Sequence, residues 1–192
     1  MKKIYIMVSY TGTILSNLIR MYTGKEYTHV SISLDIKLHE MYSFGRIHPY
    51  NAFVGGFVRE GKNFGTFKRF KKTKIAIYSI DVKDENYEEA KKTINRIKEK
   101  KEEYKFNFIG LFLVMFHKKL NRKNAFYCAE FVKYVLENSK SIDKKLPQIV
   151  KPEDFQKIDG IKLEYKGLLR SYNYKKTYSF QNLYRNREQI AV

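Results

Sequence analysis

The unbroken apolar run at residues 4–8 constrains the fold of this chain more than any other feature of its sequence. A short apolar run bounded by turn-forming residues is typical of a strand that is buried on both faces. Two lysines precede the run, as in a secretory signal, but residues 9–13 interrupt it early and no cleavage site of small residues follows. We therefore expect a buried first strand and a cytoplasmic protein.

The spacing of apolar residues predicts one helix and then two strands in the next part of the chain. Residues 14–22 carry apolar side chains at helical spacing. Residues 28–34 alternate strictly between polar and apolar side chains, which predicts a strand with His29 on its polar face. After a short turn, residues 38–44 can return as the partner strand of a hairpin.

The rest of the chain completes the expected fold. We expect a loop or lid over the glycine-rich residues 45–65, a strand over 75–80, a helix capped by Asp84, and helices over 108–120 and 128–138. This pattern predicts the α+β class, with helices packed on a mainly antiparallel sheet. We assign residues 1–160 to one domain and residues 161–192 to a basic, tyrosine-rich extension packed on the same domain.

The formal charge of +18 predicts attraction to polyanions or to a membrane surface. Most of the cations are lysines, whereas nucleic-acid readers favour arginine, so a solvated lysine surface is the simpler interpretation. The apolar stretch at residues 106–116 is too short for a membrane span, which needs about 20 residues. We expect no transmembrane segment and no specific nucleic-acid partner.

Cys128 is the chain's one cysteine, which excludes a disulfide framework. No CxxC pair or Cys/His ladder is present, so we expect neither a metal nor a cofactor. Cys128 lies at the expected start of a helix, where unpaired backbone N–H groups and the positive end of the dipole favour a thiolate. The same N–H groups could stabilise a developing oxyanion.

A cysteine nucleophile also needs a base and a group that orients the base. If the hairpin turns at residues 34–35, His29 lies directly opposite Glu40 on the same face, where the two side chains can pair. His39 is the rival for the group that orients His29. Because side chains alternate along a strand, His39 faces the side opposite Glu40 unless the register slips by one residue. His48 and His117 are interpreted as surface residues.

Two segments of the sequence resemble a known family. Residues 28–34, with the sequence THVSISL, resemble the histidine-bearing strand of the NlpC-like, papain-related cysteine hydrolases, and residues 126–132, FYCAEFV, resemble the start of their cysteine-bearing helix. Here the histidine precedes the cysteine, an order similar to that of the circularly permuted, YiiX/YaeF-like papain-fold amidases. Residues 40–46 and the following Gly55-Gly56-Phe57 also resemble members of this branch from lysine-rich Gram-positive bacteria.

The resemblance implies a circularly permuted, papain-like NlpC-type fold and roles for individual residues. It implies Cys128 as the nucleophile, His29 as the general base and acid, and Glu40 as the third polar residue. The resemblance also implies that Tyr104, upstream of the cysteine, takes the place of a pocket tyrosine of the family. Further substrate-binding candidates beside these motifs are Tyr127, Tyr42 and Ser43.

Together these features predict a cysteine amidase or peptidase, or an acyltransferase, that forms an acyl-enzyme on an amide or ester carbonyl. Members of the family that the chain resembles act on bacterial wall peptides or on lipid acyl groups, so the resemblance implies a peptide or an acyl lipid as the substrate. One alternative is a pseudoenzyme that keeps the fold. The other is a non-catalytic polyanion binder, in which tyrosines alternate with the basic residues of the C-terminal part, Lys162, Lys166, Arg170, Lys175, Lys176, Arg185 and Arg187. The sequence leaves the oligomeric state open.

Overall fold

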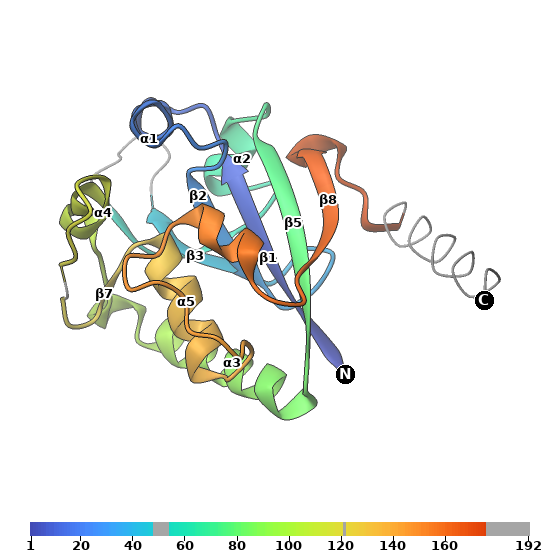
Figure 1. The fold of residues 1–192 in the computed structure, drawn as a ribbon. Coiled ribbons are helices and arrows are strands. Elements are labelled where there is room, and N and C mark those ends of the chain that lie inside the picture. Colours follow the sequence, from blue (N-terminus) through green and yellow to red (C-terminus); the bar gives the residue numbers. More distant parts are fainter. Residues whose placement is uncertain (48–53, 121, 176–192) are drawn as a thin grey trace.

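The computed structural model describes residues 1–47, 54–120 and 122–175. Its centre is a six-stranded sheet in the order β4-β3-β2-β1-β5-β8, in which each neighbouring pair is antiparallel. The strands are β1 (Lys2–Tyr10), β2 (His29–Ser33), β3 (Met41–Arg46), β4 (Gly55–Glu60), β5 (Lys74–Val82) and β8 (Lys162–Leu168). Figure 1 shows this twisted sheet with helices around it.

A short parallel pair and eight helical segments complete the described chain. The pair is β6 (Lys105–Phe106) and β7 (Ala125–Phe126). The α-helices are α1 (Ile14–Thr23), α2 (Gly65–Arg69), α3 (Asp84–Glu99), α4 (Phe108–Met115) and α5 (Cys128–Asn138). The 3₁₀ segments are η1 (Lys101–Glu103), η2 (Pro152–Lys157) and η3 (Leu169–Ser171). The α+β class with a mainly antiparallel sheet is thus confirmed.

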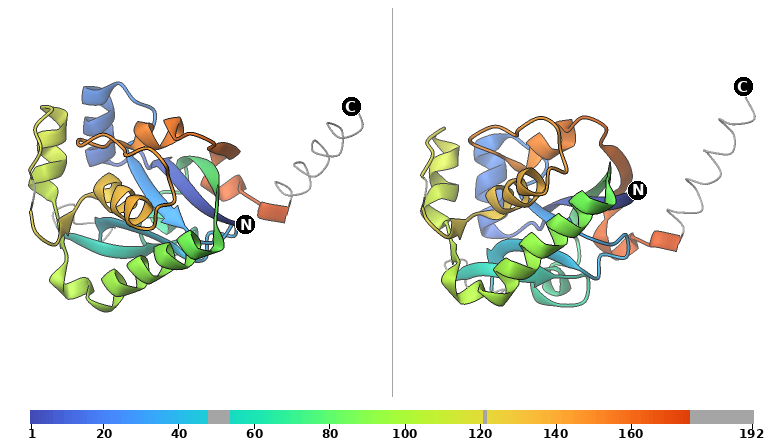
Figure 2. Two further views of the ribbon diagram at one scale, coloured as in Figure 1. Left: turned by 60° about the horizontal axis from the view of Figure 1, so that its bottom comes forward. Right: turned by 90° about the horizontal axis from the view of Figure 1, so that it is seen from below.

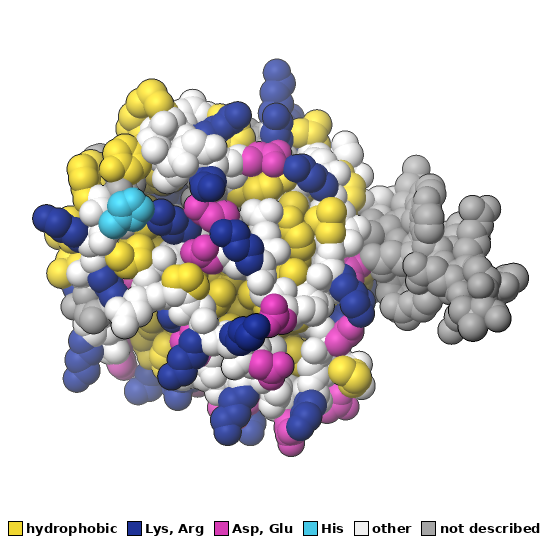
Figure 3. Space-filling view, in the orientation of Figure 1, with side chains coloured by type: hydrophobic (Ala, Val, Ile, Leu, Met, Phe, Trp, Pro, Cys, Tyr) yellow, Lys and Arg dark blue, Asp and Glu magenta, His cyan; other side chains and the backbone are white. Residues whose placement is uncertain are grey.

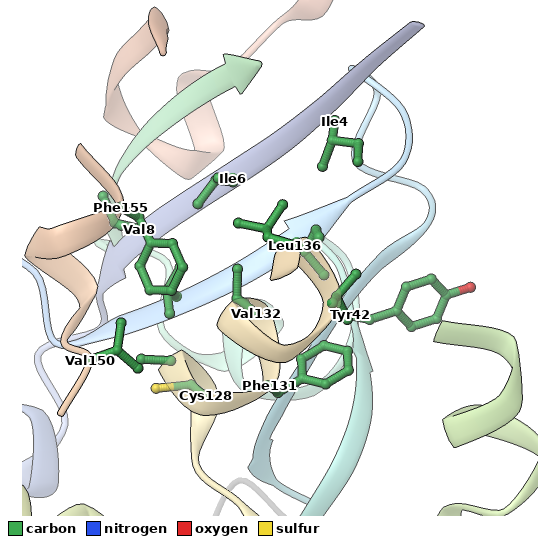
Figure 4. Packing of buried hydrophobic residues seen from close by; sticks show 14 of the residues in the cluster. Ile4, Ile6, Val8, Tyr42, Cys128, Phe131, Val132, Leu136, Val150 and Phe155 are labelled. Atoms are coloured by element: carbon green, nitrogen blue, oxygen red, sulfur yellow. The ribbon is translucent and has the colours of Figure 1, made fainter. Parts of the chain in front are cut away.

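Strand β1 is buried on both faces, as its apolar run predicts. Ile4, Ile6 and Val8 belong to the core cluster that also holds the apolar stripes of α3 and α5. Tyr5 and Met7 belong to a second cluster on the other face of the sheet. Figure 2 shows α3 and α5 lying together over one face, and Figure 4 shows the side chains of β1 directed toward α5.

The structure corrects several expected element boundaries. The glycine-rich stretch is not all loop, since β4 (Gly55–Glu60) pairs with β3 along its full length. Helix α4 ends at Met115 rather than at residue 120, and Lys83 rather than Asp84 occupies the cap position of α3. Strand β8, which lies in the expected extension, is the edge strand of the sheet and pairs with β5.

No helix among the residues that the structure describes is long and apolar enough to span a lipid bilayer.

Candidate active site

The first turn of α5 presents Cys128. Glu130 caps this turn, because its Oε2 accepts a hydrogen bond from the backbone N–H of Tyr127 at 3.1 Å. The Asn107 side-chain amide also donates to that oxygen, at 3.4 Å. Phe131 and Val132 anchor the helix in the core, where α5 packs against β2. Cys128 is 4 % exposed and is a free thiol.

His29 begins β2 and is held by a carboxylate from another strand. Its Nε2 lies 3.0 Å from Oε1 of Glu60, which ends β4. The other carboxylate oxygen of Glu60 accepts a hydrogen bond from the hydroxyl of Ser31, on the same face of β2 as His29. Cys128 lines the same cavity as His29, and its thiol contributes to raising the pKa of the imidazole. With Nε2 on Glu60, the ring nitrogen left for the thiol is Nδ1.

Cys128, His29 and Glu60, which we call the trio, have electrostatics that favour a charged imidazole on His29. Burial lowers the pKa of His29, but the Glu60 carboxylate and then Cys128 outweigh burial and raise that pKa to about 10. At neutral pH His29 is therefore an imidazolium that is bound to the Glu60 carboxylate and shares a cavity with the Cys128 sulfur. This is the arrangement that a thiolate nucleophile with a proton-donating partner requires.

The prediction that Glu40 lies opposite His29 is wrong. The hairpin does not turn at residues 34–35, because the backbone N–H of Leu34 bonds to the carbonyl of Glu40 and five residues lie between them. Glu40 is exposed in this turn, where its backbone N–H bonds to Asp35 at 2.8 Å. The observed pairing of Ile32 with Tyr42 and of Ser33 with Met41, when continued, places Gly45 opposite His29.

Small residues on β3 let Glu60 reach across that strand to β2. Gly45 and Ser43 face the same side as Glu60, and a Cβ built on Gly45 would lie 3.5 Å from Cε1 of His29 and 3.9 Å from Oε1 of Glu60. The sequence offered a weak signal for this residue. Phe57 and Val58, two residue types that favour strands, come shortly before Glu60 in a segment that was interpreted as a loop.

A cavity opens beside the trio and is lined by Cys128, His29 and Glu60. Side chains of α1 and α4, including Leu15, Ile19 and Leu111, form much of its apolar wall. A second cavity on the other side of Cys128 is lined by Tyr127 and Val150 and shares Ile19 and Leu111 with the first. Cys128 thus lines both cavities, and side chains of the same two helices border each of them.

Arg46 is a cavity residue that the sequence interpretation did not single out for a role. It ends β3, lines the first cavity and donates from Nη2 to Oγ1 of Thr13 at 3.2 Å. Burial lowers the pKa of Arg46, although the Glu60 carboxylate opposes this effect. The sequence feature that could have indicated Arg46 is its residue type, because it is an arginine in a chain whose cations are mostly lysine.

The other predicted site residues occupy different places. Tyr127 lines the second cavity, and its hydroxyl donates to the carbonyl of Val150 at 2.9 Å. Tyr42 stacks on Phe57, and Ser43 is buried with its hydroxyl bonded to the carbonyl of Val30. Tyr104 stacks on Phe126. Neither cavity beside Cys128 includes Tyr42, Ser43 or Tyr104 among its described lining residues.

The remaining histidines lie away from this trio. His39 is exposed in the hairpin turn, where its carbonyl accepts from Arg59. His117 is exposed after α4. His48 lies outside the described residues.

Several basic residues of the C-terminal part are engaged in ion pairs and hydrogen bonds. Lys162 pairs with Asp81 at 2.8 Å, Lys166 with Glu26 at 2.9 Å, and Arg170 donates to Asn63 at 3.1 Å. Lys175 lies at the end of the described chain, and Lys176, Arg185 and Arg187 lie outside it. These contacts tie part of the predicted polyanion-binding segment to the sheet.

Comparison with known proteins adds no relative: no family model matches the chain, and no curated protein matches it. Within residues 1–47, 54–120 and 122–175, no cluster of three or more His, Cys, Asp or Glu side chains could hold a metal ion.

Proposed function

We propose that this chain is a cysteine hydrolase or acyltransferase that attacks an amide or ester carbonyl through an acyl-enzyme. One observation carries the proposal: the Glu60 carboxylate holds Nε2 of His29, and Cys128 lines the same cavity as this pair. The proposed roles are nucleophile for Cys128, general acid and base for His29, and positioning residue for Glu60.

In the first step the Cys128 thiolate attacks the carbonyl carbon. The negative charge that develops on the carbonyl oxygen would be stabilised by the free N–H groups of the first turn of α5. The His29 imidazolium then gives its proton to the leaving nitrogen or oxygen as the bond to carbon breaks. The product of this step is a thioester on Cys128 and a neutral imidazole.

In the second step a water molecule or another acceptor releases the acyl group. Neutral His29 takes a proton from the acceptor as it attacks the thioester, and the thiolate leaves beside the restored imidazolium. Glu60 acts in both steps by holding Nε2 and by stabilising the charged ring. Ser31 in turn holds the second carboxylate oxygen of Glu60.

The circularly permuted, papain-like fold is part of this proposal. It is supported by an antiparallel sheet that carries the histidine, a helix that begins at the cysteine, and a histidine that precedes the cysteine in the chain. In this proposal the carboxylate comes from β4, whereas the sequence resemblance placed it on the returning strand of the hairpin.

Acylation by an activated ester such as p-nitrophenyl acetate tests the mechanism. Because Cys128 is the chain's one cysteine, an acetyl adduct that neutral hydroxylamine removes from the native chain and that is missing in Cys128→Ala is a thioester on Cys128, whereas acetyl groups on lysines resist hydroxylamine; mass spectrometry before and after hydroxylamine separates the two. We expect rapid acetylation of the native chain near neutral pH, none at a thiol in Cys128→Ala, and a rate about 10²–10⁴-fold lower in His29→Gln.

Glu40→Gln is the matched control, since it removes an exposed carboxylate outside the trio. It should acylate at the native rate. Circular dichroism verifies that each variant is folded. Native-rate acylation of His29→Gln, or an adduct of undiminished yield in Cys128→Ala, would refute the proposal.

A further inference from the structure

Helices α1 and α4 expose large apolar side chains to solvent. On α1, Ile14 is 83 % and Met21 is 77 % exposed. On α4, Ile109 is 55 % and Phe112 is 52 % exposed. Leu18, Tyr22 and Phe116 add to this group, which we call the α1/α4 surface.

The α1/α4 surface is continuous across the two helices. The rings of Tyr22 and Phe116 contact each other with centroids 5.9 Å apart. The two helices lie side by side at one end of the molecule in both views of Figure 2. In Figure 3 hydrophobic side chains gather at the corner where Figure 1 shows α1 and α4, with Lys and Arg side chains beside them.

Helix α4 is apolar on its outer face as well as on its inner face. Leu111 and Val114 face the core and the cavities, while Ile109 and Phe112 face solvent. A helix that is apolar all round is normally buried in protein or lipid. We therefore expect another molecule to bury the outer face of α4, because no described residue covers it.

The two segments that form this surface carry charges of one sign, and Glu153 is an acid from another element that lies near α1, in the lining of the second cavity. Residues 1–25, which include α1, and residues 104–129, which include α4, contain no Asp or Glu. The first acid after α1 is Glu26, and Lys166 pairs with it at 2.9 Å. Exposed cations flank the apolar side chains at Arg20, Lys25, Lys118, Lys119, Arg122 and Lys123.

We propose that the α1/α4 surface docks the protein on an anionic lipid bilayer. Aliphatic and aromatic side chains would enter the boundary between headgroups and acyl chains, and the flanking lysines and arginines would lie among lipid phosphates. A bilayer fits better than a protein partner because the surface combines an apolar centre with cations and lacks acids in both segments that form it.

Docking would also bring lipid close to Cys128. The inner side chains of the same helices, Ile19 and Leu111, line both cavities beside the sulfur. Helices α1 and α4 thus form both the docked surface, with their outer side chains, and part of the cavity lining, with their inner side chains. The docking proposal stands on the surface alone and does not depend on the thiol chemistry.

Flotation with vesicles of phosphatidylcholine, with and without phosphatidylglycerol, tests the proposal on the full chain. We expect the native chain to float with the vesicles that contain phosphatidylglycerol and to float less in high salt. Met21→Ser/Phe112→Ser should lower the partition coefficient about tenfold or more, and Lys118→Gln/Lys119→Gln should lower it by a similar factor.

Matched variants on other elements serve as controls. Leu163→Ser changes a leucine on β8 that is 54 % exposed, and Lys91→Gln/Lys92→Gln removes two exposed lysines from α3. Both should float like the native chain, and so should Cys128→Ala. Circular dichroism excludes unfolding as the cause of a loss.

Three results would overturn the proposal. The first is no flotation of the native chain with anionic vesicles, and the second is equal losses in the α1/α4 variants and their controls. The third is a loss of self-association in Met21→Ser/Phe112→Ser without a loss of flotation, which would make the surface an interface between copies. Failed acylation with intact flotation would refute only the hydrolase proposal.

Discussion

His29 fits beside Glu60 because the strand between them carries almost no side-chain volume there. Gly45 lies against Cε1 of the imidazole, and Ser43 is the next residue on the same face of β3. A large side chain at residue 45 would meet the ring. The small residues of β3 are therefore as important for the geometry of the trio as the polar residues themselves.

Glu60→Gln should separate the charge of residue 60 from its hydrogen bonding. The amide can still bond to Nε2 of His29, but it no longer stabilises the imidazolium, so the pKa of His29 should fall from about 10 toward 6.5. We expect acylation at neutral pH to slow by about ten- to a hundredfold. The alkaline limb of the pH–rate profile should also shift to lower pH.

Stopped-flow release of p-nitrophenol across the pH range measures both effects. Glu40→Gln supplies the control, since its profile should overlay that of the native chain. A Glu60→Gln profile with an unmoved alkaline limb would show that Glu60 does not set the protonation of His29.

The same titration should appear in the folding stability. The pKa of His29 is raised from 6.5 to about 10, so the folded state binds this proton more tightly than the unfolded state does. Its stabilising contribution is fully present below pH 6.5 and is lost as the pH rises through about 10. Urea unfolding of the native chain and of His29→Gln should therefore give free energies that converge between these pH values. A difference that grows with pH would mean that the proton destabilises the fold.

At the scale of elements, the periodicity of apolar residues predicted helix boundaries well, whereas the expected pairing of strands was less accurate. Helix α5 begins at Cys128 and ends at Asn138 as its apolar spacing predicts, and Gly24 ends α1 in a left-handed conformation as a helix stop should. These features depend on residues close together in the sequence. Local sequence, meaning apolar spacing for α5 and a glycine stop for α1, therefore suffices to predict them.

The hairpin register depends on the length of a turn, which the pattern does not encode. Residues 35–39 form a longer turn than expected, and Asp35 holds it by accepting bonds from the backbone N–H groups of His39 and Glu40. The longer turn moved Glu40 away from His29 and brought Gly45 into that position. Asp35, an acidic side chain that can bond to nearby backbone, was the residue that could have indicated the turn.

Strand β4 was missed because its two glycines are typical of loops. Gly55 serves instead as a close contact, since a Cβ there would lie 2.8 Å from the carbonyl oxygen of Gly45 and 2.8 Å from Cγ of Phe106. Overlooking β4 meant overlooking Glu60 at its end. The third member of the site could not be identified without knowing that this segment pairs with β3.

At the scale of the whole molecule, side chains pack on both faces of the sheet, and different elements cover each face. Helices α3 and α5 pack on one face, in the cluster that leads to Cys128. Phe67 of α2, Leu169 of η3 and Tyr172 pack on the other. The segment after residue 160 thus contributes both an edge strand and part of the second cover, although its basic composition suggested an extension.

This placement predicts opposite behaviour for two adjacent leucines. Leu169 is 2 % exposed in the second cover, whereas Leu168 is 40 % exposed. Leu169→Ala should lower the free energy of unfolding by about 2–5 kcal/mol because it leaves a cavity. Leu168→Ala should lower it by less than about 1 kcal/mol. Urea denaturation followed by circular dichroism measures both. β8 is a strand of the central sheet, and η3 packs in the second cluster against that sheet. Leu169→Ala should therefore shift the whole cooperative transition, whereas a separate early transition would mark residues 161–175 as an independent unit.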